Sequence, residues 1–101
     1  MITFQLEYTL ESQRVDDFRV YAEQFVELTR KYGGEHYGYF IRSEREETKA
    51  IALFAFTDKG HYDTYRKQVL DDPQYRKAMD LVKQTQCIES CYRTIFDRRL
   101  A

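Results

Sequence analysis

Apolar and polar residues alternate over residues 2–10, which is the period expected of a β-strand with two unlike faces. Over residues 15–32 the apolar positions instead recur every three or four residues, which predicts one face of a long helix. Ser12 is a suitable N-cap before this helix. Gly33 and Gly34 follow its last turn, where glycine takes the left-handed conformation without steric cost. The first third of the chain therefore predicts a strand followed by a helix.

Two β-prone segments come next. Residues 35–43 are rich in aromatic side chains, residues 44–47 form a polar turn, and residues 48–57 are a second β-prone run. This arrangement predicts an antiparallel hairpin. Because residues 50–56 are apolar at every position, we expect the second strand to be covered on both faces.

The rest of the chain predicts two short helices and a last strand. Asp58 can cap the first helix, and Pro73, directly after Asp72, stands where proline favours the start of the second. Alternation returns over residues 88–96 and predicts a strand. The order is βαββ, two helices, β, within one domain of residues 1–101.

This order predicts an α+β fold of the ferredoxin-like plan, βαββ(αα)β. With right-handed crossovers it gives a four-stranded antiparallel sheet with the helices on one face. The other face is left bare, although residues 50–56 offer it apolar side chains. Because soluble monomers rarely expose large apolar patches, we expect a second copy of the chain to cover this face, forming a homodimer.

Charge and composition exclude several classes of partner. Sixteen Lys and Arg residues balance seventeen Asp and Glu residues, so no overall positive field attracts nucleic acid or an anionic membrane. Residues 49–56 resemble the central strand of RNA-binding RRM domains, but Ile51 and Leu53 stand where stacking needs aromatic rings. No run approaches the ~20 apolar residues of a membrane span, and residues 1–10 lack the features of a signal peptide. We expect a cytoplasmic protein with neither a nucleic-acid nor a membrane partner.

The chain carries few signals of chemistry. Its four glycines form no phosphate-binding loop, and Cys87 and Cys91 would lie about 13 Å apart on a strand, too far for a disulfide. The two histidines, His36 and His61, show no ligand spacing with them, so we expect neither a metal site nor a cofactor. His36 is a candidate general base and Glu7 a candidate inward carboxylate, although an edge histidine and a solvated glutamate are the simpler interpretations.

Several large side chains are candidates to line a ligand cavity. If the hairpin pairs residues whose numbers have an odd sum, Tyr39 faces Phe54 and Tyr37 faces Phe56 across one surface. We expect that surface to form part of an apolar or aromatic cavity in the dimeric barrel. The residues expected to line it are Leu6, Tyr8, Tyr37, Tyr39, Phe54 and Phe56. Packing of these side chains in a filled core is the competing interpretation.

Three segments of the chain fit together as a family signature: residues 38–40 with 43–44, residues 51–56, and residues 72–75. In this order and spacing they resemble the NIPSNAP family, within the dimeric α+β barrel superfamily, and the likeness extends to residues 8–10. The resemblance implies a ferredoxin-like protomer whose sheet packs against that of a twin, giving a barrel with a cavity on each side. The wider superfamily includes cofactor-free monooxygenases and haem-degrading enzymes.

Departures from the family pattern bear on function. Leu6, Ala52 and Phe54 stand where the resemblance implies Arg, His and Trp, so the cavity of this chain would be more apolar. The preferred hypothesis is a dimeric barrel that binds a small apolar or aromatic molecule. One alternative is a cofactor-free monooxygenase acting on an aromatic or phenolic substrate, with His36, Glu7 or a tyrosine handling protons. The other is an interaction module with a filled dimer core.

Overall fold

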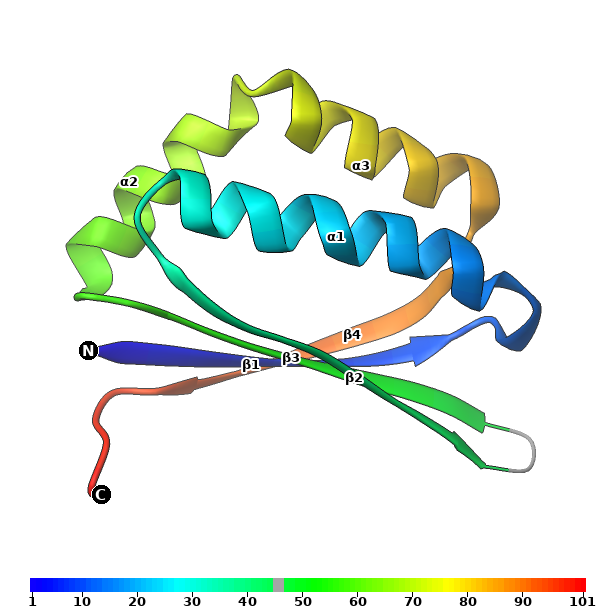
Figure 1. Ribbon diagram of the computed structural model, residues 1–101, viewed down its shortest axis with the longest axis horizontal. Coiled ribbons are helices and arrows are strands. Elements are labelled where there is room, and N and C mark those ends of the chain that lie inside the picture. The colour runs from blue at the N-terminus through cyan, green and yellow to red at the C-terminus, as the bar shows by residue number, and fades with distance from the viewer. Residues whose placement is uncertain (45–46) are drawn as a thin grey trace.

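The helices and strands follow the predicted order, and the ferredoxin-like α+β plan is confirmed (Figure 1). This computed structural model describes residues 1–44 and 47–101; Arg45 and Glu46, the centre of the predicted turn, lie outside the described residues. The elements are β1 (Ile2–Leu10), α1 (Val15–Lys31), β2 (Glu35–Glu44), β3 (Glu47–Phe56), α2 (Lys59–Leu70), α3 (Pro73–Thr85) and β4 (Ile88–Phe96), with a 3-10 turn (Ser12–Arg14) before α1.

The four strands form one sheet in the order β2-β3-β1-β4, and each neighbouring pair is antiparallel. All three helices lie on one side of this sheet (Figure 1). None of these described helices is long and apolar enough to cross a membrane. The opposite side of the sheet, which we call the open face, carries none of the described helices.

The caps of the helices follow the sequence for α2 and α3 but not for α1. The carboxylates of Asp58 and Asp72 accept backbone N–H groups of the first turns of α2 and α3, at 2.8 and 2.9 Å. At the first helix the prediction differs from the structure, because Ser12 opens the 3-10 turn and Glu11 is the residue that caps it. Gly33 follows the end of α1 with φ +87°, as its predicted role requires.

The register of the hairpin differs from the prediction, and β2 contains a bulge. The pairing with β3 shifts between His36 and Gly38, so Tyr37 has no partner across the strand pair. Gly38 has φ +105°, a conformation that side chains other than glycine rarely adopt. Between the bulge and the turn, Tyr39 lies opposite Ala52, in the same register as Glu44 and Glu47 at the turn, and not opposite Phe54 as expected.

The core lies between the helices and the sheet. One cluster contains Tyr8, which is 2% exposed and packs on α1 through Phe18. The other contains Phe4, whose ring stacks on Phe54 of the neighbouring strand at 5.0 Å and on Tyr62 of α2 at 4.1 Å between centroids. Leu6 packs against both clusters and marks their junction.

Candidate functional site

An inner cavity of about 190 Å³ lies between the helices and the sheet. Aromatic rings form most of its wall, namely those of Tyr8, Tyr21, Phe25, Tyr39, Phe54, Tyr62, Tyr65 and Tyr75. The remaining lining residues are Leu6, Thr29, His36, Arg66, Val69 and Arg93. Because these residues come from all four strands and all three helices, the complete fold is needed to build the inner cavity.

Burial favours the protonated form of three phenols in the inner cavity, those of Tyr8, Tyr21 and Tyr39. It raises the pKa of Tyr21 to about 12, and it also raises the pKa values of Tyr8 and Tyr39. A protonated phenol can both donate and accept a hydrogen bond. The wall therefore combines apolar ring surface with uncharged polar groups.

His36 contributes a neutral imidazole to this wall. Its ring stacks on Tyr39, with centroids 5.1 Å apart, and on Phe54, with centroids 5.7 Å apart. Burial, assisted by the positive charge of Arg30, lowers the pKa of His36 to about 4. Its Nδ1 accepts the backbone N–H of Gly38 at 2.9 Å, so the neutral ring carries its hydrogen on Nε2. This arrangement suits a hydrogen-bond donor better than the general base suggested by the sequence.

Two arginines meet at one end of the inner cavity. Arg66 of α2 and Arg93 of β4 each donate a hydrogen bond from Nη1 to the Tyr62 hydroxyl, at 3.0 and 3.1 Å. Neither residue was among the site residues expected from the sequence. Alternation along β4 places Arg93 on the helix-facing side of the sheet, but its approach to α2 is a long-range contact with no local signal.

Four of the six residues expected in a ligand cavity line the inner cavity: Leu6, Tyr8, Tyr39 and Phe54. Phe56 lies in the neighbouring aromatic cluster, 1% exposed, and does not line the cavity. Tyr37 lies apart from the others, 49% exposed, with its hydroxyl donating to the Glu35 carboxylate at 2.6 Å. The structure thus corrects the expected arrangement, because the buried rings face the helices of their own chain rather than the open face.

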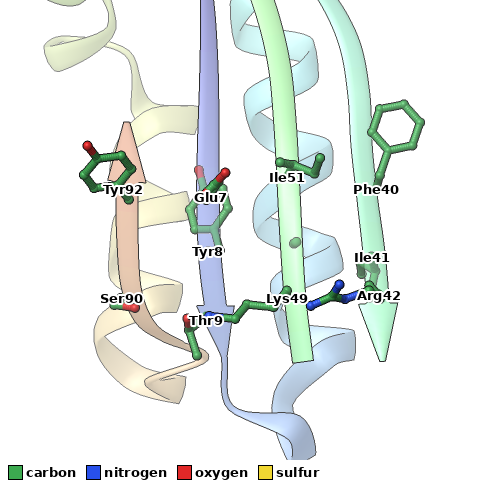
Figure 2. Close-up of a pocket in the computed structure, with 11 residues that line it drawn as sticks. Glu7, Tyr8, Thr9, Phe40, Ile41, Arg42, Lys49, Ile51, Ser90 and Tyr92 are labelled. Atoms are coloured by element: carbon green, nitrogen blue, oxygen red, sulfur yellow. Dashed lines mark hydrogen bonds between the residues drawn. The ribbon is translucent and has the colours of Figure 1, made fainter. Parts of the chain in front are cut away.

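The open face carries a separate, broader depression of about 540 Å³. Figure 2 shows a row of side chains that crosses the four strands in the order Tyr92, Glu7, Ile51 and Phe40. A second row consists of Ser90, Thr9, Lys49 and Arg42, in which Lys49 Nζ donates to the Thr9 hydroxyl at 2.8 Å. In the first row, Tyr92 and Phe40 make the two outer edges of the depression apolar. The second row is polar throughout.

Glu7 belongs to this open face, where its carboxylate accepts a hydrogen bond from the Gln5 side chain at 2.8 Å. It is exposed, which matches a solvated glutamate and not an inward carboxylate. His36 lies on the other side of the sheet, in the inner cavity. The two candidate catalytic residues therefore cannot act together on one bound molecule.

No group of three or more His, Cys, Asp or Glu side chains comes together as a metal site within residues 1–44 and 47–101. Cys87 is buried, Cys91 is exposed, and both are free thiols. The side chains that line the inner cavity supply hydrogen bonding, aromatic stacking and the positive charge of two guanidinium groups.

Residues 6–97 match the sequence model of the NIPSNAP family. Among proteins with curated functions, none matches this sequence.

Solved structures share the fold over nearly the whole chain. A NIPSNAP family protein of unknown function from Agrobacterium tumefaciens superposes with a TM-score of 0.78 and 18% identity, covering 97% of this chain and 87% of that chain. An uncharacterized NIPSNAP domain protein from Burkholderia xenovorans gives a TM-score of 0.78 and 14% identity, covering 98% and 95%. A protein described as an antibiotic biosynthesis monooxygenase gives 0.66 and 13% identity, covering 99% and 100%. At these identities the likeness establishes a common fold and no common reaction.

Proposed function

Starting from the finding that this chain belongs to the NIPSNAP family, we propose that it binds a small aromatic molecule in the inner cavity. The observation that carries this proposal is the inner cavity itself, about 190 Å³ of space walled by aromatic rings in the centre of the fold. Apolar, ring-lined concavities with a few polar groups are the usual form of a small-molecule site.

The volume of the inner cavity limits the size of the ligand. An apolar cavity of about 150 Å³ holds a benzene-sized ring, whereas drug-sized ligands occupy about 300–1,000 Å³. At about 190 Å³, the inner cavity fits a single substituted ring.

The polar groups of the wall favour a ligand that carries an oxygen. With Nδ1 of His36 occupied by Gly38, its Nε2–H remains as a donor, and the protonated phenols of Tyr8 and Tyr39 add further hydrogen-bonding groups. The ring of such a ligand would stack on the wall while its oxygen accepts from these donors.

We also propose that the protein is a homodimer joined through the open face. Phe40, Tyr92 and Phe96 point away from the helices on this face and are 54%, 69% and 46% exposed. Ile51 and Leu53 of β3 extend the same apolar surface. A second copy offers an identical sheet, so one interface would cover both faces at once and produce the dimeric barrel.

The free thiols fit a reducing compartment such as the cytoplasm.

A second candidate function is oxygenation of a bound phenol. It is favoured by the shared fold with a protein described as an antibiotic biosynthesis monooxygenase and by the donors that surround the inner cavity. In that case the hydrogen-bonding groups would hold the phenol oxygen while molecular oxygen oxidises the ring to a quinone, with one oxygen atom entering the product, the other leaving as water and the substrate supplying the electrons. The test is oxygen consumption with single-ring phenols, and no uptake above the rate of protein-free buffer would reject it.

Binding itself is tested in two steps. Native mass spectrometry of the purified protein detects any co-purified molecule, and ligand-observed NMR then measures binding of a panel of single-ring aromatics, including phenol, benzamide and benzoate. We expect saturable binding of one molecule per chain and competition among the members of the panel. If none of these compounds binds and no molecule co-purifies, the filled-core alternative replaces this proposal.

A further inference from the structure

The cluster of Arg66, Arg93 and Tyr62 indicates the charge of the ligand. We propose that the inner cavity takes a single-ring aromatic carboxylate, with the ring inside and the carboxylate bound by Arg66 and Arg93. This inference rests on the proposed function and adds the ligand class to it.

The first observation is that two guanidinium groups converge on one neutral oxygen. Arg66 and Arg93 come from different elements, yet both Nη1 atoms lie about equally far from the Tyr62 hydroxyl, at 3.0 and 3.1 Å. A phenol oxygen is a weak acceptor for two cations, whereas a carboxylate forms shorter and stronger hydrogen bonds with guanidinium groups. The geometry is therefore that of an anion site in which a hydroxyl occupies the acceptor position.

The second observation is the lack of a carboxylate partner within the chain. Over residues 1–44 and 47–101, the salt bridges involve other cations, and neither Arg66 nor Arg93 has an acidic side chain within 4.0 Å. Both guanidinium groups thus remain available to a bound anion.

The third observation is the charge of the approach to the inner cavity. The residues of the cluster also line an outer groove of about 470 Å³ between α2 and the sheet, where Lys59 and Lys67 add positive charge. The carboxylate in this groove is Asp63, which lies 3.8 Å from Lys59 Nζ. With four cations and one carboxylate in its lining, the outer groove attracts anions. It leads to the cluster of Arg66, Arg93 and Tyr62.

The shape of the site favours a carboxylate among the anions. Arg66 and Arg93 supply the positive charge in the lining of the inner cavity, whereas His36 and the phenols offer neutral donors to other oxygens of a ligand, so the anionic group is held at the end where the arginines lie. Guanidinium groups match the planar pair of oxygens of a carboxylate, and the inner cavity has room for one ring behind it.

The test compares acids with their neutral amides on the complete protein. Isothermal titration with benzoate and phenylacetate, against benzamide and phenylacetamide, measures the preference for charge. We expect each acid to bind about tenfold or more tightly than its amide, and the preference to weaken as salt is raised. The double variant Arg66→Gln, Arg93→Gln should bind acid and amide equally, while Arg19→Gln, Arg76→Gln, with the same change in charge at exposed positions, should keep the preference.

The outcomes separate the two proposals. Equal binding of acids and amides by the natural protein, or a preference that survives in the Arg66→Gln, Arg93→Gln variant, overturns the carboxylate inference and leaves the proposed function standing. Absence of binding by all four compounds overturns both. Binding of the amides also reports that the inner cavity of each variant is intact, so a folding defect is not mistaken for loss of the anion site.

Discussion

The imidazole of His36 stacks on the ring of Tyr39, with the centroids 5.1 Å apart and the planes inclined by 16°. This contact belongs to the wall of the inner cavity and keeps the imidazole away from water. Burial there lowers the pKa of His36 to about 4, whereas an unfolded chain has a histidine pKa of about 6.5. Protonation of His36 and folding therefore oppose each other.

The first prediction follows from this linkage. Between pH 6.5 and about 4 the unfolded chain binds a proton at His36 that the folded chain does not, so the free energy of unfolding falls as the pH is lowered through this window. The fall attributable to His36 is on the order of 3 kcal/mol. Urea unfolding measured at intervals from pH 7 to pH 4 gives this dependence.

The control is His36→Asn, because its side-chain oxygen can still accept the Gly38 N–H while the group no longer titrates. We expect a lower stability at pH 7 and a flatter dependence on pH. If the variant and the natural protein show the same slope between pH 6.5 and 4, His36 is not the buried neutral group described here.

The second prediction concerns Asp72, which joins the end of α1 to the start of α3. Its carboxylate accepts from Lys31 Nζ at 2.7 Å, from the Tyr32 hydroxyl at 2.6 Å and from the N–H of Gln74 at 2.9 Å. Lys31 first, then Tyr32 and Gln74, lower the pKa of Asp72 to about 2. The stabilisation is therefore present above the unfolded pKa of about 3.9 and is lost as the pH falls toward 2.

Two substitutions at Asp72 separate its cap from its charge. Asp72→Asn removes the charge but keeps an oxygen for the helix cap, whereas Asp72→Ala removes the charge and the cap. We therefore expect the natural protein to have the highest melting temperature, the Asn variant a lower one and the Ala variant the lowest. The loss for Ala is about 4–8 °C at pH 7. Asp80→Asn, at an exposed site of α3, should leave the melting temperature unchanged. If the Asn variant has the same melting temperature as the natural protein, the contact with Lys31 contributes nothing to stability.

Clear periods in the sequence predicted β1, α1 and β4, whereas β-prone composition predicted β2 and β3. Alternation in β1 places Phe4, Tyr8 and Leu10 on one face, and these are the side chains that the helices bury. The polar residues between them, including Gln5 and Glu7, already indicated that the face of β1 away from the helices is polar. Alternation therefore identified which side chains of β1 are buried. It did not show that the cavity they line lies under the helices and not on the open face.

Other features depend on contacts that no local pattern contains. Gly38 within a strand was a signal for a bulge, and the bulge is what removes Tyr37 from the cavity residues. Arg66 of α2 and Arg93 of β4 are 27 positions apart in the sequence, and both contact the Tyr62 hydroxyl. Long-range geometry of this kind is fixed by packing, which is why the anion site appeared only in the structure.

The third prediction distinguishes an open cavity from a filled core. Leu6→Phe adds a ring at the junction of the two core clusters, on the wall of the inner cavity. If the space is open, we expect the variant to keep its stability and to bind benzoate and benzamide about tenfold more weakly or worse. Thermal melts and the titrations described above measure both quantities.

Leu70→Phe is the matched control, because Leu70 is 58% exposed on α2 and lies outside the inner cavity. It should change neither stability nor binding. A filled core would give the opposite result for Leu6→Phe, namely a loss of about 1–3 kcal/mol of stability from overpacking.

The fourth prediction tests the homodimer through Ile51, which lies in the centre of the open face between Glu7 and Phe40 (Figure 2). Ile51→Glu would place a second carboxylate beside Glu7 and would bury a charge in the proposed interface, so we expect a monomer where the natural protein sediments as a dimer at micromolar concentration. Val20→Glu adds the same charge at a residue of α1 that is 47% exposed, and it should remain dimeric. The monomer of Ile51→Glu should still bind aromatics, because the inner cavity is built within one chain. A natural protein that sediments as a monomer would contradict the dimer, and a dimer that survives Ile51→Glu would move its interface away from the open face.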